Sequence, residues 1–314
     1  MTEGNTSELL KRKSSFFLHL QVLLKFPTSL PDWLHKQACY YYLIMKNKSE
    51  ILKEEEIFHD NWAKKINLND LCVLQAFEGP VSPEYNFAIG VLGNLKGKRV
   101  LNPGCGAGEE AVYLAKMGAN VFAVDLSSCM LRVAKKLARK FKVENKIKFE
   151  KINAEKTRFK NESFDLILGN SILHHVNIED SASEFNRVLK RGGKAVFIEP
   201  LFYNPIINYY RRIANLVRTP SEHPLKFSDI AIFKKYFKSV NHYEFQLFTL
   251  IIFGYFFLIE RIRPNQDRYW KKIIREGGRY AKAFNCLFLI DKILLKFFPF
   301  LRRFCWVTVI EAIK

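Results

Sequence analysis

Between residues 98 and 200, short apolar runs alternate with segments whose apolar residues recur at helical spacing. The run 100–102 is typical of a buried strand in a parallel sheet, whereas 109–117 has helical spacing and ends before Gly118, a favourable helix terminus. Further strands are expected at 121–124, 147–152, 164–168 and 194–198, and further helices from Ser127 or Ser128 to about 141 and at 182–189. This alternation predicts a Rossmann-like, doubly wound α/β sheet.

The first sixty residues follow a different pattern. Helical spacing is present at 16–24 and 33–45, with prolines between these segments and a charged stretch after them at 48–56. Residues 1–58 are therefore predicted to form a helical N-terminal extension, and residues 59–314 the main domain.

After Pro200 the alternation of short strands and helices breaks down. A helix is expected at 202–217, and strands at 239–248 and 306–313. The stretches 247–259 and 283–298 are apolar, but they are too short or too charged to cross a bilayer. Residues 200–238 and 249–303 are interpreted as insertions into the main domain that bind a substrate or face a membrane.

The chain is strongly basic, with a formal net charge of +19, and residues 200–314 hold 20 Lys and Arg against 8 Asp and Glu. Such a surface attracts nucleic acid, anionic lipid headgroups or a phosphorylated substrate; an ordinary solvated face is the simpler explanation. The six cysteines form no CxxC pair, which argues against structural zinc or a disulfide framework. A cytoplasmic protein, in solution or at the membrane surface, is expected.

Gly104, Gly106 and Gly108 follow the first strand and allow the backbone to approach a ligand closely where the strand turns into a helix. A dinucleotide-binding loop would have its third glycine at 109, but this chain has Glu109. An acid at this place suits a cofactor that carries an amino group and a sulfonium.

Polar residues also end the next two strands. Asp125 can accept hydrogen bonds from two ribose hydroxyls, or it can merely cap the following helix. Asn153 and Ala154 are placed to read adenine, with an ordinary turn as the alternative for Asn153.

Three segments carry a resemblance to a known family: VLNPGCGAGEEAVYLAKMGANVFAVDLS, FDLILGNSILHHV and EFNRVLKRGGKAVFIEP. They resemble the class I S-adenosylmethionine (SAM) dependent methyltransferases, in particular the UbiE-like branch, also described as methyltransferase type 11. The resemblance runs from about His59 to the C-terminus. It implies a seven-stranded sheet whose last strand, here 306–313, is antiparallel, and it implies SAM as the cofactor.

The resemblance also assigns roles to individual residues. Met130 is expected to pack on adenine, and Asn170 to contact the methionine part or position its loop. Asn102 stands where the family has an acid, so Glu109 or a water would replace that acid. His59, Asp60 and Trp62 resemble the segment that closes over SAM. The expected cofactor-binding residues are Asn102, Gly104, Cys105, Gly106, Gly108, Asp125, Leu126, Met130, Asn153, Ala154 and Asn170.

Methyl transfer needs alignment of the acceptor and, for some acceptors, removal of a proton. His174 and His175 follow the fourth strand, and an imidazole titrates in the useful range. His175 is preferred as the base, because the acceptor-side histidine of related Glu-His-Val motifs aligns with it; either histidine can instead pack inward or cap the turn. No spacing of His, Cys or acidic residues indicates a metal site.

The segment after Pro200 is rich in aromatic, Asn and Arg residues and is interpreted as an acceptor-binding lid, with a solvated helix and loop as the alternative. Its arginines suit a phosphate or carboxylate. The candidate substrate-binding residues are Tyr203, Asn204, Tyr209, Arg211, Arg212, Arg218 and His223.

The leading hypothesis is an enzyme that methylates a small lipophilic or anionic acceptor, such as a lipid, isoprenoid, quinone or glycolipid-like compound, at a membrane surface. An RNA or DNA methyltransferase is the alternative suggested by the charge. The chain lacks a (D/N)PP(Y/F) motif after the fourth strand and any recognisable RNA-binding motif, so nucleic acid is not the expected partner. A non-catalytic binding protein with this fold is a third alternative.

Overall fold

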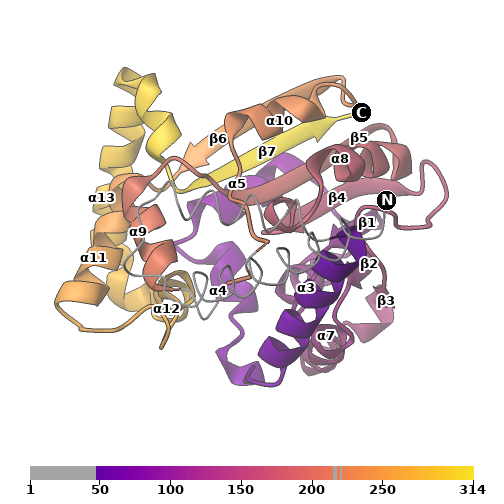
Figure 1. Ribbon diagram of the computed structural model, residues 1–314, viewed down its shortest axis with the longest axis horizontal. Helices are drawn as coiled ribbons and strands as arrows, with labels where there is room; N and C mark the ends of the chain where they lie inside the picture. Colours follow the sequence, from indigo (N-terminus) through magenta and orange to yellow (C-terminus); the bar gives the residue numbers. More distant parts are fainter. Residues whose placement is uncertain (1–46, 215–217, 220) are drawn as a thin grey trace, which may run out of the picture.

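A computed structural model describes residues 47–214, 218–219 and 221–314 of the chain. The helices expected at 16–24 and 33–45, and the last residues of the helix expected at 202–217, lie outside this described part. A seven-stranded sheet in the order β3-β2-β1-β4-β5-β7-β6 forms the centre of the fold (Figure 1). Its strands are β1 (Arg99–Pro103), β2 (Asn120–Asp125), β3 (Ile147–Lys151), β4 (Phe164–Asn170), β5 (Leu189–Pro200), β6 (Ser239–Phe245) and β7 (Val307–Ile313).

The strand directions confirm the expected fold class. β1 to β5 pair in parallel, and β7 is antiparallel to both β5 and β6. Because the parallel strands are covered on both faces, successive residues of one strand enter two different cores. In β5, Val196 and Ile198 pack into one core, while Ala195 and Phe197 pack into the other.

Helices follow the strands as the spacing indicated. Ser127 caps α7, since its hydroxyl accepts the backbone N–H of Met130 at 3.0 Å. α9 begins at Pro205, with Asn204 as its N-cap, and is described to Ile213. The helices around the sheet are α4 (Val73–Glu78), α5 (Pro83–Leu92), α6 (Glu109–Lys116), α7 (Ser128–Lys140), α8 (Ile178–Val188), α9 (Pro205–Ile213) and α10 (Phe227–Phe233).

The boundary expected between residues 58 and 59 falls inside one helix. α3 (Lys48–Ala63) begins with a capping box formed by Asn47 and Glu50, and it packs along α7. The end of the N-terminal extension therefore belongs structurally to the main domain.

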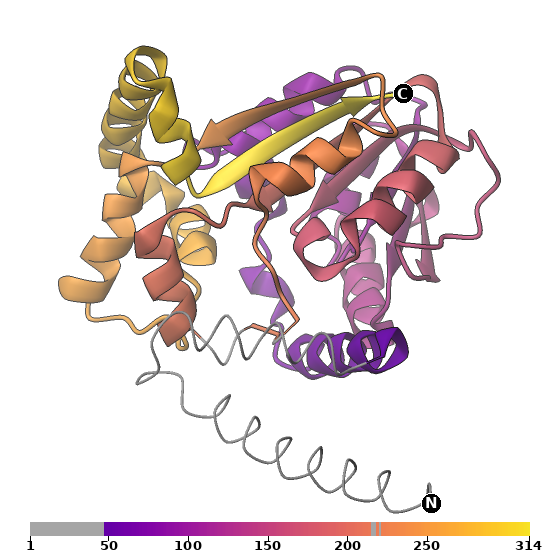
Figure 2. The ribbon, with the colours of Figure 1, turned by 45° about the horizontal axis from the view of Figure 1, so that its top comes forward.

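The longest insertion lies between β6 and β7. It contains α11 (Ile251–Leu258), α12 (Tyr269–Arg275) and α13 (Gly277–Phe297), which lie together with α9 at one side of the molecule (Figure 1 and Figure 2). Asp291, buried in α13, accepts the backbone N–H groups of Leu247 and Phe248 at 3.0 and 2.6 Å, and this anchors α13 to the end of β6. Within the described ranges, no helix is long and apolar enough to cross a membrane.

Candidate functional site

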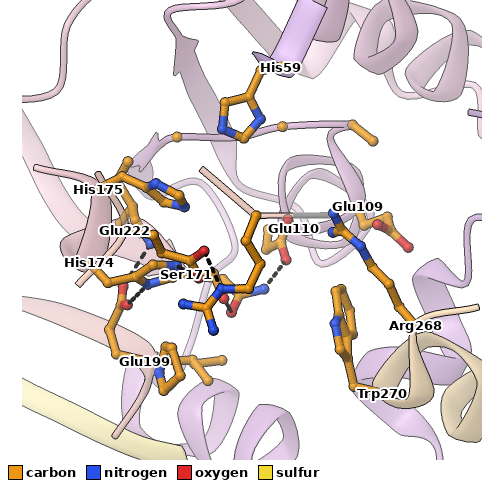
Figure 3. A pocket seen from close by; sticks show the side chains of 18 of the residues that line it. His59, Glu109, Glu110, Ser171, His174, His175, Glu199, Glu222, Arg268 and Trp270 are labelled. Atoms are coloured by element: carbon orange, nitrogen blue, oxygen red, sulfur yellow. Dashed lines mark hydrogen bonds and ion pairs between the residues drawn. The ribbon is translucent and has the colours of Figure 1, made fainter. Parts of the chain in front are cut away.

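A cavity of about 310 Å³ lies at the carboxyl ends of the parallel strands, where ligands bind in open α/β sheets. Its walls come from the loop after β1, the ends of β2, β4 and β5, and parts of α3, α9 and α12. Figure 3 shows that His59 of α3 points toward His175, with Glu109, Glu110, Arg268 and Trp270 on the other side.

The loop after β1 is shaped by glycines at two crowded positions. Gly104 has a φ of +62°, and a Cβ there would lie 2.5 Å from the Ile172 side chain. Gly108 has a φ of +88°, and a Cβ there would lie 2.7 Å from that of Ala134 on α7. Both positions therefore require glycine. Gly106 between them lines the cavity with space beside it, so its backbone is open to a ligand.

Asp125 ends β2 and faces this loop. Its carboxylate accepts the backbone N–H groups of Gly106 and Ser127, both at 2.8 Å, and its burial raises the pKa. The carboxylate is thus held in place by backbone donors and keeps further lone pairs for a ligand.

Most of the candidate cofactor residues come together around the cavity, but two do not line it. Asn102 lies behind the loop, fully buried, and its amide donates to the Leu168 carbonyl at 2.8 Å. Gly108 lies at the helix contact described above. The residues that line the cavity are Gly104, Cys105, Gly106, Asp125, Leu126, Met130, Asn153, Ala154 and Asn170.

The two acids that open α6 have different surroundings. The charge of Glu109 is balanced by Lys271, which lies 2.9 Å away, and its carboxylate also accepts the Cys72 N–H at 3.0 Å. Glu110 accepts one hydrogen bond from Asn170 at 2.7 Å, and burial, with a smaller effect of Glu109, raises its pKa to about 6. Glu110, which the sequence analysis did not single out, is therefore the acid without a cation.

His174 is fixed by two carboxylates. Its Nδ1 lies 2.7 Å from Glu199 and its Nε2 lies 3.3 Å from Glu222. Burial alone would lower the pKa of His174, but the charges of Glu199 and Glu222 outweigh it and raise this pKa to about 9. Both ring nitrogens of His174 are thus engaged, and the ring is protonated at neutral pH.

His175 faces the N-terminal helix. Its Nδ1 lies 3.3 Å from Glu55, which also lies 3.5 Å from His59 Nε2. These three donor atoms lie within 4.8 Å of one another, as do those of His174, His175 and Glu222. Neither Glu55 nor either grouping is expected from the sequence, because the members of each grouping are far apart in the chain. For the grouping of Glu55, His59 and His175, the one signal in the sequence is the spacing of Glu55, His59 and Trp62, which places them on one face of α3.

Two of the seven candidate substrate residues, Arg211 and Arg218, line the cavity. Arg218 pairs with Glu222 at 2.8 Å, whereas Arg211 donates to the neutral oxygens of Asn208 and Leu201, at 2.8 and 3.0 Å. Burial, with a smaller effect of Arg218, lowers the pKa of Arg211 to about 9. Among the described residues, no carboxylate forms an ion pair with Arg211.

The other five candidates lie outside the cavity lining. Asn204 caps α9, and Tyr203 accepts the Phe227 N–H at 3.1 Å. Tyr209 and Arg212 are exposed on α9, and the His223 backbone N–H donates to the His174 carbonyl. These five residues were expected to face the ligand because the whole segment after Pro200 is polar. In the structure, only one side of α9 faces the cavity.

Residues 101–197 match a family described as a methyltransferase domain. A Bacillus subtilis protein named uncharacterized methyltransferase YcgJ is 30% identical over 39% of this chain and 49% of its own length. The ubiquinone biosynthesis O-methyltransferase of Nitrosococcus oceani is 33% identical over 48% of this chain and 60% of its own length. The demethylmenaquinone methyltransferase of Chlorobaculum parvum is 28% identical over 60% of this chain and 69% of its own length.

The chain spans about half the length of the first of these relatives. Among solved structures, geranyl diphosphate C-methyltransferase from Streptomyces coelicolor A3(2) has a TM-score of 0.49 and 18% identity, covering 74% of this chain and 77% of that one.

The raised pKa of His174 makes stability depend on pH. The folded chain holds this proton more tightly than the unfolded chain, whose histidines have the ordinary pKa of 6.5. The contribution of protonated His174 to the free energy of unfolding is therefore complete below about pH 6.5 and is lost as pH rises through about 9. Urea unfolding should show a smaller free energy of unfolding at pH 9 than at pH 6.5, and His174→Gln should abolish most of this difference. His242→Gln, on the more exposed β6, is the control and should keep the difference. If His174→Gln lost as much unfolding free energy between pH 6.5 and 9 as the wild-type chain does, the raised pKa of His174 would be contradicted.

Proposed function

Because the chain carries a class I, UbiE-like SAM-dependent methyltransferase domain, we propose that it methylates a small lipophilic acceptor that bears an anionic group. The observation that carries the acceptor part of this proposal is the part-buried guanidinium of Arg211, which lines the cavity and forms no ion pair with a carboxylate among the described residues. The cofactor part is supported by the loop after β1 and by Asp125.

The described residues fit SAM, which supplies when bound a methyl group on a positively charged sulfur. Asp125 has lone pairs that can accept the ribose hydroxyls, and Met130, Asn153 and Ala154 line the wall on which adenine would rest. Glu110 is the acid suited to the amino group, because a cation would restore the ionised form that burial disfavours. Glu110 thus takes the role left open by Asn102.

The proposed acceptor part of the cavity combines the guanidinium of Arg211 with apolar side chains. Ile207, Ile273 and Trp306 line the same cavity as Arg211. A buried guanidinium is stabilised by an anion, and Arg presents several donors to a phosphate or carboxylate. Two relatives are named for ubiquinone and menaquinone synthesis, which supports a lipophilic acceptor.

His175 is the proposed base. His174 does not suit this role, because it is protonated at neutral pH and both of its nitrogens face carboxylates. His175 lines the same cavity, and no described residue is hydrogen-bonded to its Nε2.

We also propose that the insertion docks on a membrane surface. Leu258, Phe297 and Phe300 are 70%, 68% and 67% exposed, and they belong to the group of helices at one side of the molecule (Figure 2). Lys292 and Lys296 lie on the same helix, α13. Apolar side chains can enter the lipid surface while lysines contact anionic headgroups.

Binding of S-adenosylhomocysteine tests the cofactor site. This ligand should raise the melting temperature, whereas NAD should not. Asp125→Asn should weaken its affinity at least tenfold by calorimetry, since a hydrogen bond to a charged group is worth roughly 1.5–3 kcal/mol. Asp70→Asn, at an exposed position outside the cavity, is the matched control. Stabilisation by NAD alone, or unchanged affinity in folded Asp125→Asn, would contradict the proposal.

Farnesyl diphosphate and farnesol test the anionic part of the acceptor, because they share the same apolar chain and only the first carries a diphosphate group at its end. With S-adenosylhomocysteine bound, the diphosphate should raise the melting temperature more than the alcohol does. Arg211→Gln should remove this difference, whereas Arg212→Gln, exposed on the same helix, should keep it. Equal responses to both compounds in the wild-type chain would argue for an uncharged acceptor.

Vesicle sedimentation tests the membrane proposal. The chain should pellet with vesicles that contain phosphatidylglycerol, and less so as salt rises, because each basic residue near an anionic surface contributes about 1 kcal/mol. Replacing Phe297 and Phe300 by Ser should weaken this binding. Met117→Ser, which removes an exposed apolar side chain at the C-cap of α6, should not. A wild-type chain that stays in the supernatant at low salt would show that the acceptor is reached in solution.

A further inference from the structure

The carboxylate of Glu55 connects three segments that are distant in the chain. Glu55 is 3% exposed, and its Oε2 lies 3.3 Å from His175 Nδ1 and 3.5 Å from His59 Nε2. Its Oε1 accepts a hydrogen bond from the Ser221 hydroxyl. Burial alone would raise the pKa of Glu55, but the two imidazoles and Ser221 hold it well below its usual range. The carboxylate is therefore ionised at neutral pH.

An ionised carboxylate beside Nδ1 selects one tautomer of His175. In the tautomer that this carboxylate favours, the ring proton is on Nδ1, which also lies 3.5 Å from the Thr219 hydroxyl, and the lone pair is on Nε2. Nε2 has no hydrogen-bond partner among the described residues, and His175 lines the cavity. Nε2 is therefore the atom that can take a proton from a bound acceptor.

We propose that Glu55 is a positioning residue for methyl transfer, holding His175 in the orientation and tautomer in which Nε2 acts as the base. This inference rests on the proposed function. The acceptor's proton moves to Nε2, the electron pair left on the acceptor forms the bond to the methyl carbon, and the electrons of the broken S–CH3 bond stay on sulfur. The imidazolium that forms is offset by the charge of Glu55, as in other carboxylate–histidine pairs.

The position of Glu55 on α3 links the base to the cofactor site. Asp60, on the same helix, accepts the Ser127 hydroxyl at 2.5 Å and the Cys129 N–H at 3.1 Å. Ser127 in turn donates its backbone N–H to Asp125. The helix is thus fixed both to the end of β2, which carries the ribose acid, and to His175. The base is complete only when α3 is docked on the domain.

The tautomer of His175 can be measured without knowing the acceptor. Long-range ¹H–¹⁵N spectra of histidine-labelled chain, with S-adenosylhomocysteine present, report which ring nitrogen carries the proton, and His175→Gln identifies the signal. The wild-type chain should show the Nδ1–H form. Glu55→Leu should shift His175 toward the Nε2–H form, because the acceptor at Nδ1 is lost.

Glu56→Leu is the matched control, because Glu56 is the next residue of α3 and pairs with Lys151 away from the cavity. It should leave the tautomer unchanged. If Glu55→Leu does not fold, the wild-type tautomer and the Glu55→Gln variant still test whether Glu55 sets the tautomer of His175. Gln keeps the shape of the side chain but removes its charge, so it should reduce the Nδ1–H fraction.

Three outcomes would overturn the proposal. The first is an Nε2–H tautomer of His175 in the wild-type chain, and the second is an Nδ1–H tautomer that persists in Glu55→Leu. The third is a divalent metal ion that copurifies with the chain, is removed by EDTA and is lost from His59→Ala, because Glu55, His59 and His175 would then be ligands. Failure of S-adenosylhomocysteine to bind would instead contradict the proposed function, while the tautomer would still test the Glu55–His175 contact.

Discussion

Seven carboxylic side chains line one cavity, and each buried charge among them needs donors or a cation close by. Asp125 is held by two backbone N–H groups, and Glu199 by the N–H groups of Ile172 and Leu173 together with His174. The other five acids are Glu55, Glu84, Glu109, Glu110 and Glu222. Because their partners come from different segments, satisfying these charges fixes the loop after β1, the turn after β4 and helix α3 against one another. The relative placement of these three segments therefore depends on the partners that the buried charges require.

The sequence was sufficient for the part of the fold that depends on local pattern. Apolar runs located the strands of the central sheet to within a few residues, and the positions of Asp125 and Asn170 at strand ends placed them at the same edge. Glycine spacing identified the loop, because Gly104 and Gly108 are required by contacts that any residue with a Cβ would disrupt. The resemblance to the methyltransferases added the antiparallel last strand, which spacing alone does not give.

The sequence was insufficient where a role depends on distant partners. Asn102 occupies the expected place in the motif, but its amide donates to the Leu168 carbonyl of β4. Lys271 of α12 pairs with Glu109, so that Glu110 is the acid of this pair that forms no ion pair within the described part of the chain. Glu55 and His175 are brought together only by the packing of α3 on the domain. The choice between His174 and His175 likewise rests on Glu222, which no local pattern connects to either histidine.

The additions to the sheet close the cavity from two ends of the sequence. The guanidinium of Arg268, which precedes α12, lies 3.8 Å from the ring centroid of Trp62 on α3, and both residues line the cavity. A cation over an aromatic face is attracted, and more strongly where water is excluded. The contact therefore joins the helix that holds His175 to the insertion that is proposed to meet the membrane.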